Sequence, residues 1–159
     1  PVIFTRAANV YGPGQQIYRI IPKSMLFARL RKKIKLHGGG NSKRSFIYIE
    51  DVCDGIYKII KRGKIGETYH LSTNKITTIR ELVKKICQLT STKFKNLVKV
   101  SKDRKGKDKA YLLNTEKLRK TLKWRDKTKL EDGMKKTLHW IDKNFGYLKK
   151  QPKEYKHKI

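Results

Sequence analysis

The stretch Val2-Ile-Phe-Thr-Arg-Ala-Ala-Asn-Val-Tyr-Gly-Pro13 decides the fold class. It opens with a short apolar run, Val2 to Phe4, which is typical of a strand buried on both faces of a parallel sheet. It ends at Gly12-Pro13, which cannot continue a central strand. Open α/β sheets bind ligands just beyond the carboxyl ends of their strands, so we expect Asn9 and Tyr11 at a ligand site. Because the chain begins on this strand and without Met, we interpret it as the second half of a longer protein.

The length and composition indicate a folded domain rather than a membrane or disulfide-rich protein. A chain of 159 residues suits one domain with enough residues to bury a core. No run reaches the roughly 18 apolar residues of a membrane span, and no signal peptide is visible. Cys53 and Cys87 lack the spacing of metal ligands and fall in helical patterns, which predicts two buried, inert thiols. We therefore expect a cytoplasmic protein with no membrane partner and no metal.

The net charge of +28, from 41 Lys and Arg against 13 Asp and Glu, makes a nucleic-acid-binding module the alternative from another functional class. The basic residues are spread over every predicted helix, mostly on polar faces. The nearest thing to a basic arm is the C-terminal tail, Lys149 to Lys158. Aromatic residues interleaved in the manner of RNA-binding strands are absent. This distribution favours a Lys-rich solvated surface over a nucleic-acid site.

Apolar periodicity predicts a mixed α/β chain. Helices are expected over residues 20–30, 50–63, 79–89, 115–122 and 130–145, and strands over 2–6, 34–37, 44–49, 66–72 and 97–100. The second helix should bury a stripe formed by Ile49, Val52, Ile56, Ile59 and Ile60. Thr78 with Glu81, and Thr128 with Glu131, have the spacing of capping boxes that begin the third and fifth helices. Residues 146–159 read as a basic, flexible tail after a domain of residues 1–145.

The two strands at 2–6 and 68–71 lack the crossover partners that a parallel sheet requires. We therefore expect most of the sheet to lie in an absent N-terminal half. The chain is then the C-terminal part of an extended Rossmann-type fold, with the last parallel strands and a small mixed α/β substrate-binding domain.

Few residues identify themselves as catalytic. The chain has no Gly-x-Ser-x-Gly, no metal-binding His pair and no Walker loop, and Gly38-Gly-Gly40 is not followed by Lys-Ser/Thr and a helix. His70 ends a strand, where a ligand contact and a plain capping role are equally good interpretations. Groups suited to binding a diphosphate lie at the ends of predicted elements, and these are Asn9, Arg19, Arg44, His70, Arg104 and Tyr111. Periodicity alone does not select these six among so many cations.

Four motifs in order carry a family resemblance. They are Thr5-Arg6-Ala-Ala-Asn9-Val-Tyr-Gly-Pro13, then Arg44-Ser-Phe-Ile-Tyr-Ile-Glu-Asp51, then Gly66-Glu-Thr-Tyr69, and then Asp103-Arg-Lys-Gly-Lys-Asp108 with Tyr111 and Leu122-Lys-Trp124. Over residues 1 to about 145 the chain resembles the second half of the extended short-chain dehydrogenases. These are the NAD-dependent sugar-nucleotide epimerases and dehydratases, and the fourth motif is similar to the dTDP-glucose 4,6-dehydratase branch.

The resemblance implies roles for individual residues. Asn9 matches an asparagine that touches the substrate diphosphate, and Arg44 and Arg104 match arginines that bind the phosphates and ribose. Leu36 and His37 fall where the base is held, Tyr111 matches a tyrosine lining the nucleotide site, and Ala7 lies beside the nicotinamide of NAD. Arg19 and His70 stand where the dehydratases have Lys and Asn, and Tyr18 replaces Glu, while Lys105 and Lys107 replace Pro and His. These departures leave diphosphate binding intact and the identity of base and sugar open.

The resemblance also implies the chemistry and what the chain lacks for it. In the family a tyrosine takes a proton from the sugar hydroxyl as hydride passes to NAD, water then leaves, and the hydride returns. We expect that Tyr-x-x-x-Lys pair and the glycine-rich NAD loop in the absent half, so the chain alone should be inactive. The implied partners are a nucleotide sugar and, for the complete protein, a second copy. A 4-epimerase or decarboxylase of the same family, and a degenerate homologue used for assembly, remain alternatives.

Overall fold

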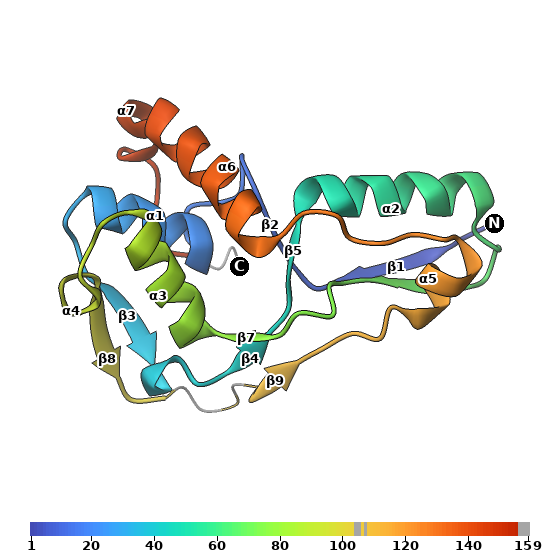
Figure 1. Cartoon of the computed structure of the whole chain (residues 1–159), viewed down its shortest axis with the longest axis horizontal. Helices are drawn as coiled ribbons and strands as arrows, with labels where there is room; N and C mark the ends of the chain where they lie inside the picture. Colours follow the sequence, from blue (N-terminus) through green and yellow to red (C-terminus); the bar gives the residue numbers. More distant parts are fainter. Residues whose placement is uncertain (104–105, 107, 156–159) are drawn as a thin grey trace.

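The first strand, β1 (Phe4–Ala7), pairs in parallel with β6 (Thr68–Leu71), with Arg6 opposite His70. In the computed structural model, which describes residues 1–103, 106 and 108–155, this pair forms one end of the molecule (Figure 1). Helix α2 (Ile49–Arg62) runs along the two strands, and α5 (Glu116–Thr121) packs beside β6. The predicted strands at 2–6 and 68–71 are therefore confirmed as direct neighbours.

The apolar run at the start of the chain is not buried, contrary to the prediction. Val2 is 56% and Phe4 60% exposed, because β6 is the one strand that pairs with β1 among the described residues. The predicted stripe of α2 is also wrong in part, since Ile56 and Ile60 are exposed. Helix α2 faces the core through Val52, Gly55 and Ile59, so residues one position further along point away from it.

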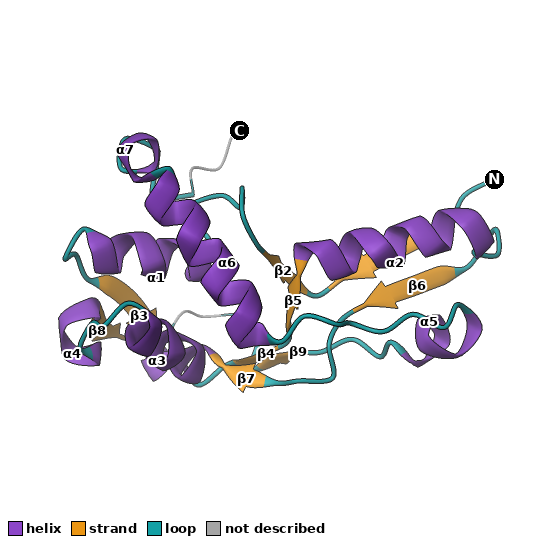
Figure 2. Ribbon diagram, turned by 45° about the horizontal axis from the view of Figure 1, so that its top comes forward, coloured by secondary structure: helices purple, strands orange, loops and turns teal. Residues whose placement is uncertain are grey.

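A pair of short parallel strands leads to the second part of the molecule, where β2 (Asn9–Tyr11) lies beside β5 (Phe46–Tyr48) (Figure 2). The remaining strands form two further small sheets. In one, β3 (Ile34–His37) runs parallel to β8 (Val98–Ser101), and in the other β4 (Lys43–Arg44) lies between β7 (Thr77–Thr78) and β9 (Ala110–Tyr111). The strand predicted over 44–49 is thus interrupted at Ser45 and contributes to two sheets.

Three helices enclose the core of this second part, namely α1 (Ile20–Arg29), α3 (Ile79–Leu89) and α6 (Leu130–Lys143) (Figure 2). Their buried residues include Met25, Leu26, Leu82, Ile86 and Ile141, each with no exposed surface. The shorter helices are α4 (Phe94–Leu97), the 3₁₀ turn Gly38–Gly40, and α7 (Phe145–Leu148). The helices predicted over residues 20–30, 79–89 and 130–145 are therefore confirmed within two residues at each end.

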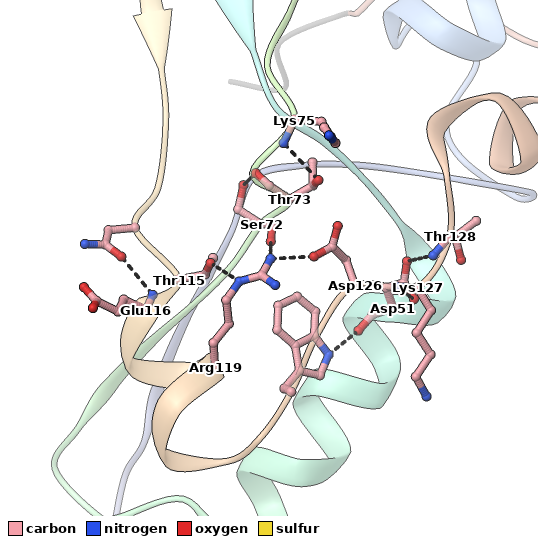
Figure 3. A network of polar contacts seen from close by, with 12 residues as sticks. Asp51, Ser72, Thr73, Lys75, Thr115, Glu116, Arg119, Asp126, Lys127 and Thr128 are labelled. Carbon is pink, nitrogen blue, oxygen red and sulfur yellow. Dashed lines mark hydrogen bonds and ion pairs between the residues drawn. The ribbon is translucent and has the colours of Figure 1, made fainter.

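The two predicted capping boxes have different outcomes. Thr78 begins α3 as predicted, because its Oγ1 accepts from the N–H of Glu81 at 3.1 Å and Glu81 Oε2 accepts from the N–H of Thr78 at 2.8 Å. Thr128 does not cap α6, which begins at Leu130 after Lys129. Its N–H instead donates to Asp51 Oδ2 at 3.0 Å (Figure 3). Asp51 therefore accepts the N–H that Glu131 would accept in a capping box, and α6 begins without a side-chain cap.

Asp51 and Arg119 connect the two parts of the molecule through a polar network (Figure 3). Asp51 is 5% exposed and accepts from the N–H groups of Lys127 and Thr128, both at 3.0 Å, while its carbonyl accepts from the indole of the fully buried Trp124 at 3.1 Å. Arg119 lies 5.4 Å from the Trp124 ring and bonds to Asp126, the Ser72 carbonyl and Thr115 Oγ1. These contacts fix the segment between α5 and α6 against α2.

The two cysteines differ in exposure. Cys87 is buried as predicted, but Cys53 is exposed, because it lies on the solvent side of α2.

No helix among the described residues is long and apolar enough to cross a membrane. Helix α7 extends into the segment 146–159 that we predicted to be a flexible tail, and Leu148 at its end is buried in the core. The division at residue 145 stays a prediction.

Candidate functional site

A cleft of about 1440 Å³ opens where β2 ends and α1 begins. Its walls come from residues 7–21 around the Gly12-Pro13-Gly14 turn, from the first turns of α1, from β3, and from Arg44 and Tyr111 of the sheet β7-β4-β9. Strand β2 ends at Tyr11 and residues 12–16 after it line the cleft, so the cleft lies beyond the carboxyl end of this parallel strand. This is the position at which open α/β sheets bind ligands.

The cleft gathers most of the residues that the sequence nominated. Ala7, Asn9, Arg19, Leu36, His37, Arg44 and Tyr111 all line it. His70 does not line it, because its imidazole Nδ1 lies 3.1 Å from the carbonyl of Asn114, a structural contact between β6 and the segment before α5. Arg104 lies outside the described residues. Strands β1 and β6 are paired, but the His70 side chain does not reach the cleft.

Asn9 and Arg44 are positioned by neighbouring backbone. The amide of Asn9 donates to the Ser45 carbonyl at 3.1 Å, which ties β2 to the chain between β4 and β5. Arg44 donates to the carbonyls of Lys43 at 2.7 Å and Asp108 at 3.0 Å, and it is paired with Tyr111 across β4 and β9. A guanidinium has five N–H donors in a fixed fork, so backbone bonds of this kind orient the group for an anion.

Strand β3 forms the opposite wall and alternates as a half-buried strand does. Ile34 and Leu36 are each 2% exposed, while Lys35 and His37 turn the other way. Because the side chain of Leu36 is packed into the core, a ligand at this position would meet its backbone. His37 Nδ1 lies 3.0 Å from Ser101 Oγ on the paired strand β8 and 3.3 Å from the Lys102 carbonyl.

The sequence did not nominate three further cations of this cleft, which are Lys23, Lys33 and Lys35. Together with Arg19 and Arg44 they give the described part of its lining five basic side chains, against one carboxylate, that of Glu154. In a chain with 41 Lys and Arg, no sequence signal separates these three from the surface. The cleft therefore has the charge of a site for a polyanion.

Among the described residues, no Tyr-x-x-x-Lys pair lines the cleft. Tyr11 is 2% exposed, donates to the Leu130 carbonyl at 3.1 Å, and has a pKa raised far above its ordinary value by burial and by Tyr48. The spacing Tyr-x-x-x-Lys does occur once in the sequence, at Tyr57 and Lys61, which corrects our reading of the motif as absent. Tyr57 is 61% exposed on α2, Lys61 Nζ lies 5.7 Å from its ring centre, and neither residue lines the cleft. Among the described residues, no cluster of His, Cys, Asp or Glu could hold a metal ion.

Comparison with known proteins agrees with the motifs. Residues 1–137 match the model of the GDP-mannose 4,6 dehydratase family. The chain is 35% identical over 150 residues to dTDP-D-glucose 4,6-dehydratase of Homo sapiens, covering 91% of this chain and 43% of the human protein. It is 36% identical over 144 residues to the trifunctional UDP-glucose 4,6-dehydratase/UDP-4-keto-6-deoxy-D-glucose 3,5-epimerase/UDP-4-keto-L-rhamnose-reductase of Arabidopsis thaliana, covering 91% of this chain and 21% of that protein.

The fold agrees as well. The crystal structure of the dTDP-glucose 4,6-dehydratase of Streptomyces venezuelae, with NAD and the ligand TYD bound, superimposes with a TM-score of 0.87 at 30% identity. That match covers 91% of this chain and 45% of the Streptomyces chain, so the chain spans less than half the length of these relatives. From the ordered motifs, the α/β fold with its parallel strands, and the family match over residues 1–137, the chain belongs to the GDP-mannose 4,6 dehydratase family of extended short-chain dehydrogenases.

Proposed function

We propose that this chain is the substrate-binding, C-terminal half of an NAD-dependent sugar-nucleotide 4,6-dehydratase similar to dTDP-glucose 4,6-dehydratase. The observation that carries the proposal is the cleft itself. Its described lining has five cations, Arg44 among them, and it also contains the motif residues Asn9 and Tyr111. A nucleoside diphosphate carries charge that matches such a lining, and guanidinium groups bind phosphate oxygens with two parallel bonds.

The residues of the cleft divide into three tasks in this proposal. Asn9, Arg19 and Arg44 hold the diphosphate, while Arg104, to which the resemblance assigns a phosphate or ribose contact, lies outside the described residues. Leu36 and His37 hold the base through the β3 wall, and Tyr111 lines the same region beside Arg44. His70 has no ligand in this assignment, because its imidazole contacts the Asn114 carbonyl.

The residues of this chain fit one edge of the NAD site and not the whole of it. Ala7, at the end of β1 and in the cleft wall, is the one residue we assign beside the nicotinamide. The sequence contains no glycine-rich dinucleotide loop. When bound in the complete protein, NAD supplies a hydride acceptor that returns the hydride after water has left. Asn9, Arg19 and Arg44 hold the sugar nucleotide in place for that chemistry, and the proton-abstracting tyrosine comes from the other half.

Exposed apolar groups around β1 and α2 support a missing half. Ile56, Tyr57, Ile60 and Ile65 are exposed there together with Val2 and Phe4. Large exposed apolar surface marks a contact with another segment or chain, and one edge of β1 is unpaired within the described residues. We propose that the complete protein covers this surface and works in the cytoplasm, where its two free cysteines stay reduced. The homodimer stays a prediction, which native mass of the complete protein would check.

The alternatives to this proposal differ in the ligand of the cleft or in the reaction that follows binding. A 4-epimerase or decarboxylase of the same family would use the same binding residues, and its product would show the difference. A nucleic-acid-binding module, suggested by the charge of +28, requires binding that weakens steeply with salt. The concentration of family motif residues in one cleft favours the sugar nucleotide over both nucleic acid and a degenerate assembly role.

The substitution Arg44→Ala tests the assignment in the complete protein, expressed with any sequence that precedes Pro1 in its gene. Loss of a charge-assisted diphosphate contact should cost about 1.5–3 kcal/mol, or on the order of tenfold to a hundredfold in Kd. Arg125→Ala is the matched control, because Arg125 is exposed between α5 and α6 and outside the cleft. Equal binding by the two variants would contradict the proposal. Incubation of the wild type with NAD and dTDP-, UDP-, GDP- and CDP-sugars, followed by mass, separates loss of water from an isobaric epimer.

A further inference from the structure

The C-terminal segment returns to the cleft after α7. Leu148 is 3% exposed in the core, and the N–H of Gln151 donates to the Leu148 carbonyl at 3.1 Å. Lys153 Nζ donates to the carbonyls of Lys149 at 2.7 Å and Gln151 at 3.1 Å, which folds the segment back on itself. Glu154 and Tyr155 consequently line the cleft beside the start of α1.

Glu154 meets a cation that already faces the cleft. Lys23 belongs to the first turns of α1, and its side chain is 17% exposed. Its Nζ lies 2.7 Å from Glu154 Oε1 and 5.4 Å from the centre of the Phe27 ring. A cation that is mostly desolvated against an aromatic ring is stabilised by an anion. Among the described residues, Glu154 is the one carboxylate in the lining of the cleft, and its own side chain is 79% exposed.

Tyr155 makes the second contact of the segment with the cleft. Its ring packs edge-on against Tyr18, with ring centres 5.3 Å apart and planes at 63°. The guanidinium of Arg19 lies 5.5 Å from the centre of the same Tyr18 ring. The Tyr18 ring therefore contacts both Tyr155 of the C-terminal segment and Arg19, which we assign to the diphosphate.

We propose that residues Gln151–Tyr155 form a lid over the cleft, in which the Glu154 carboxylate holds Lys23 in place of a phosphate group of the ligand. Lys23 is then a further phosphate-binding residue of this site, and the lid competes with the nucleotide. This rests on the proposed function, since it takes the ligand to be a nucleoside diphosphate. A ligand phosphate displaces Glu154 readily, because an ion pair with so exposed a carboxylate is weak.

The competition predicts in which direction the ligand affinity changes when the lid is weakened, and this direction can be measured. For a ligand that binds only the open state, the apparent Kd equals the intrinsic Kd divided by the fraction of open protein. Removing the Glu154 charge favours the open state and should tighten binding. An exposed ion pair of about 0.5–1 kcal/mol corresponds to a gain of about twofold to fivefold in affinity. Without Lys23 the Glu154 charge has no partner at this place, so its removal should change nothing further.

The experiment is titration calorimetry of the complete protein with UDP, dTDP and inorganic pyrophosphate. The variants are Glu154→Gln, Tyr155→Ala, Lys23→Ala and the double variant of Lys23 and Glu154. Glu116→Gln is the matched control, because it removes the same charge from an ion pair with Lys120 on α5, outside the cleft. Hydrogen exchange of residues 18–24 in the ligand-free protein reports whether the lid is closed, without any ligand.

We expect Glu154→Gln and Tyr155→Ala to bind about twofold to fivefold more tightly than the wild type and to raise exchange at residues 18–24. Lys23→Ala should bind more weakly, and the double variant should match it. Unchanged or weaker binding by Glu154→Gln and Tyr155→Ala would overturn the lid and leave the proposed function standing. Absence of binding in every variant, including those with the lid opened, would overturn the proposed function and the lid together.

Discussion

The substitution Asp51→Asn tests how the core holds the floor of the cleft. Asp51 is 5% exposed, and its two carboxylate oxygens accept from the N–H groups of Lys127 and Thr128 at 3.0 Å each. An asparagine of the same shape keeps one acceptor oxygen but presents an NH₂ group to the second N–H. One charge-assisted bond is lost and one backbone donor stays unsatisfied.

The size of the effect follows from these contacts. A hydrogen bond to a charged group contributes about 1.5–3 kcal/mol to stability. Asp51 is also in the first turn of α2, where a negative charge contributes about 0.3–1 kcal/mol. We therefore expect Asp51→Asn to lower the free energy of unfolding by about 2–4 kcal/mol, a large part of the stability of a single domain.

Urea denaturation followed by tryptophan fluorescence measures this change, because the indole of Trp124 donates to the Asp51 carbonyl and is fully buried. Asp142→Asn is the matched control, since Asp142 forms a surface ion pair with Arg29 and is 42% exposed. Its loss should cost less than about 1 kcal/mol. A difference between the two variants below about 0.5 kcal/mol would refute the reasoning.

Two other substitutions, Gly133→Ala and Glu81→Gln, test the packing of α6 and the cap of α3. Gly133→Ala should destabilise by about 1–3 kcal/mol, because its new Cβ would meet the Tyr11 hydroxyl and lie 2.8 Å from Tyr48 Cδ2. Gly146→Ala, where nothing lies within 4 Å, serves as its control in the same urea assay, and equal losses would contradict the packing argument. Hydrogen bonds from Thr78 lower the pKa of Glu81 below its ordinary value of 4.5, so the stability that Glu81 contributes is present above that pH and is lost as the pH falls through its folded pKa. Acid unfolding of Glu81→Gln should therefore lose part of its pH dependence below 4.5, and a profile identical to the wild type would contradict this.

Local sequence patterns predicted the capping box of α3, and contacts between residues far apart in the sequence explain where such patterns failed. The sequence Thr78-x-x-Glu81 formed its capping box, whereas the same pattern at Thr128 failed because Asp51, 77 residues away, accepts the Thr128 N–H. Ile56 and Ile60 have helical spacing, but nothing within the sequence indicated that α2 would face the core through Gly55 instead. The pattern of apolar residues gives the period of a helix, but it does not show which face of the helix the rest of the molecule covers.

The same distinction applies to the cleft. The motif residues Asn9, Arg44 and Tyr111 were nominated by resemblance, and the fold brings them to one cleft. Lys23, Lys33 and Lys35 had no such signal, since their identity as cleft cations depends on the position of β3 and α1. Glu154 belongs to a segment that composition described as a flexible basic tail, and only tertiary contacts place it against Lys23.

The position of Tyr11 shows how stability and binding are joined in this chain. Its hydroxyl donates to the carbonyl of Leu130, the first residue of α6, and Gly133 one turn later leaves the space that its ring occupies. Asp51 accepts from the N–H groups of Lys127 and Thr128, shortly before α6 begins at Leu130, so we expect a change there to move the start of the helix that supports Tyr11. Tyr11 in turn lines the cleft and follows Asn9 on β2. Asp51→Asn should therefore weaken binding of UDP or dTDP in the complete protein as well as lower its stability, although Asp51 does not line the cleft. Unchanged affinity in a variant that has lost the expected 2–4 kcal/mol would show that Asn9 and Arg44 keep their geometry without the support of α6.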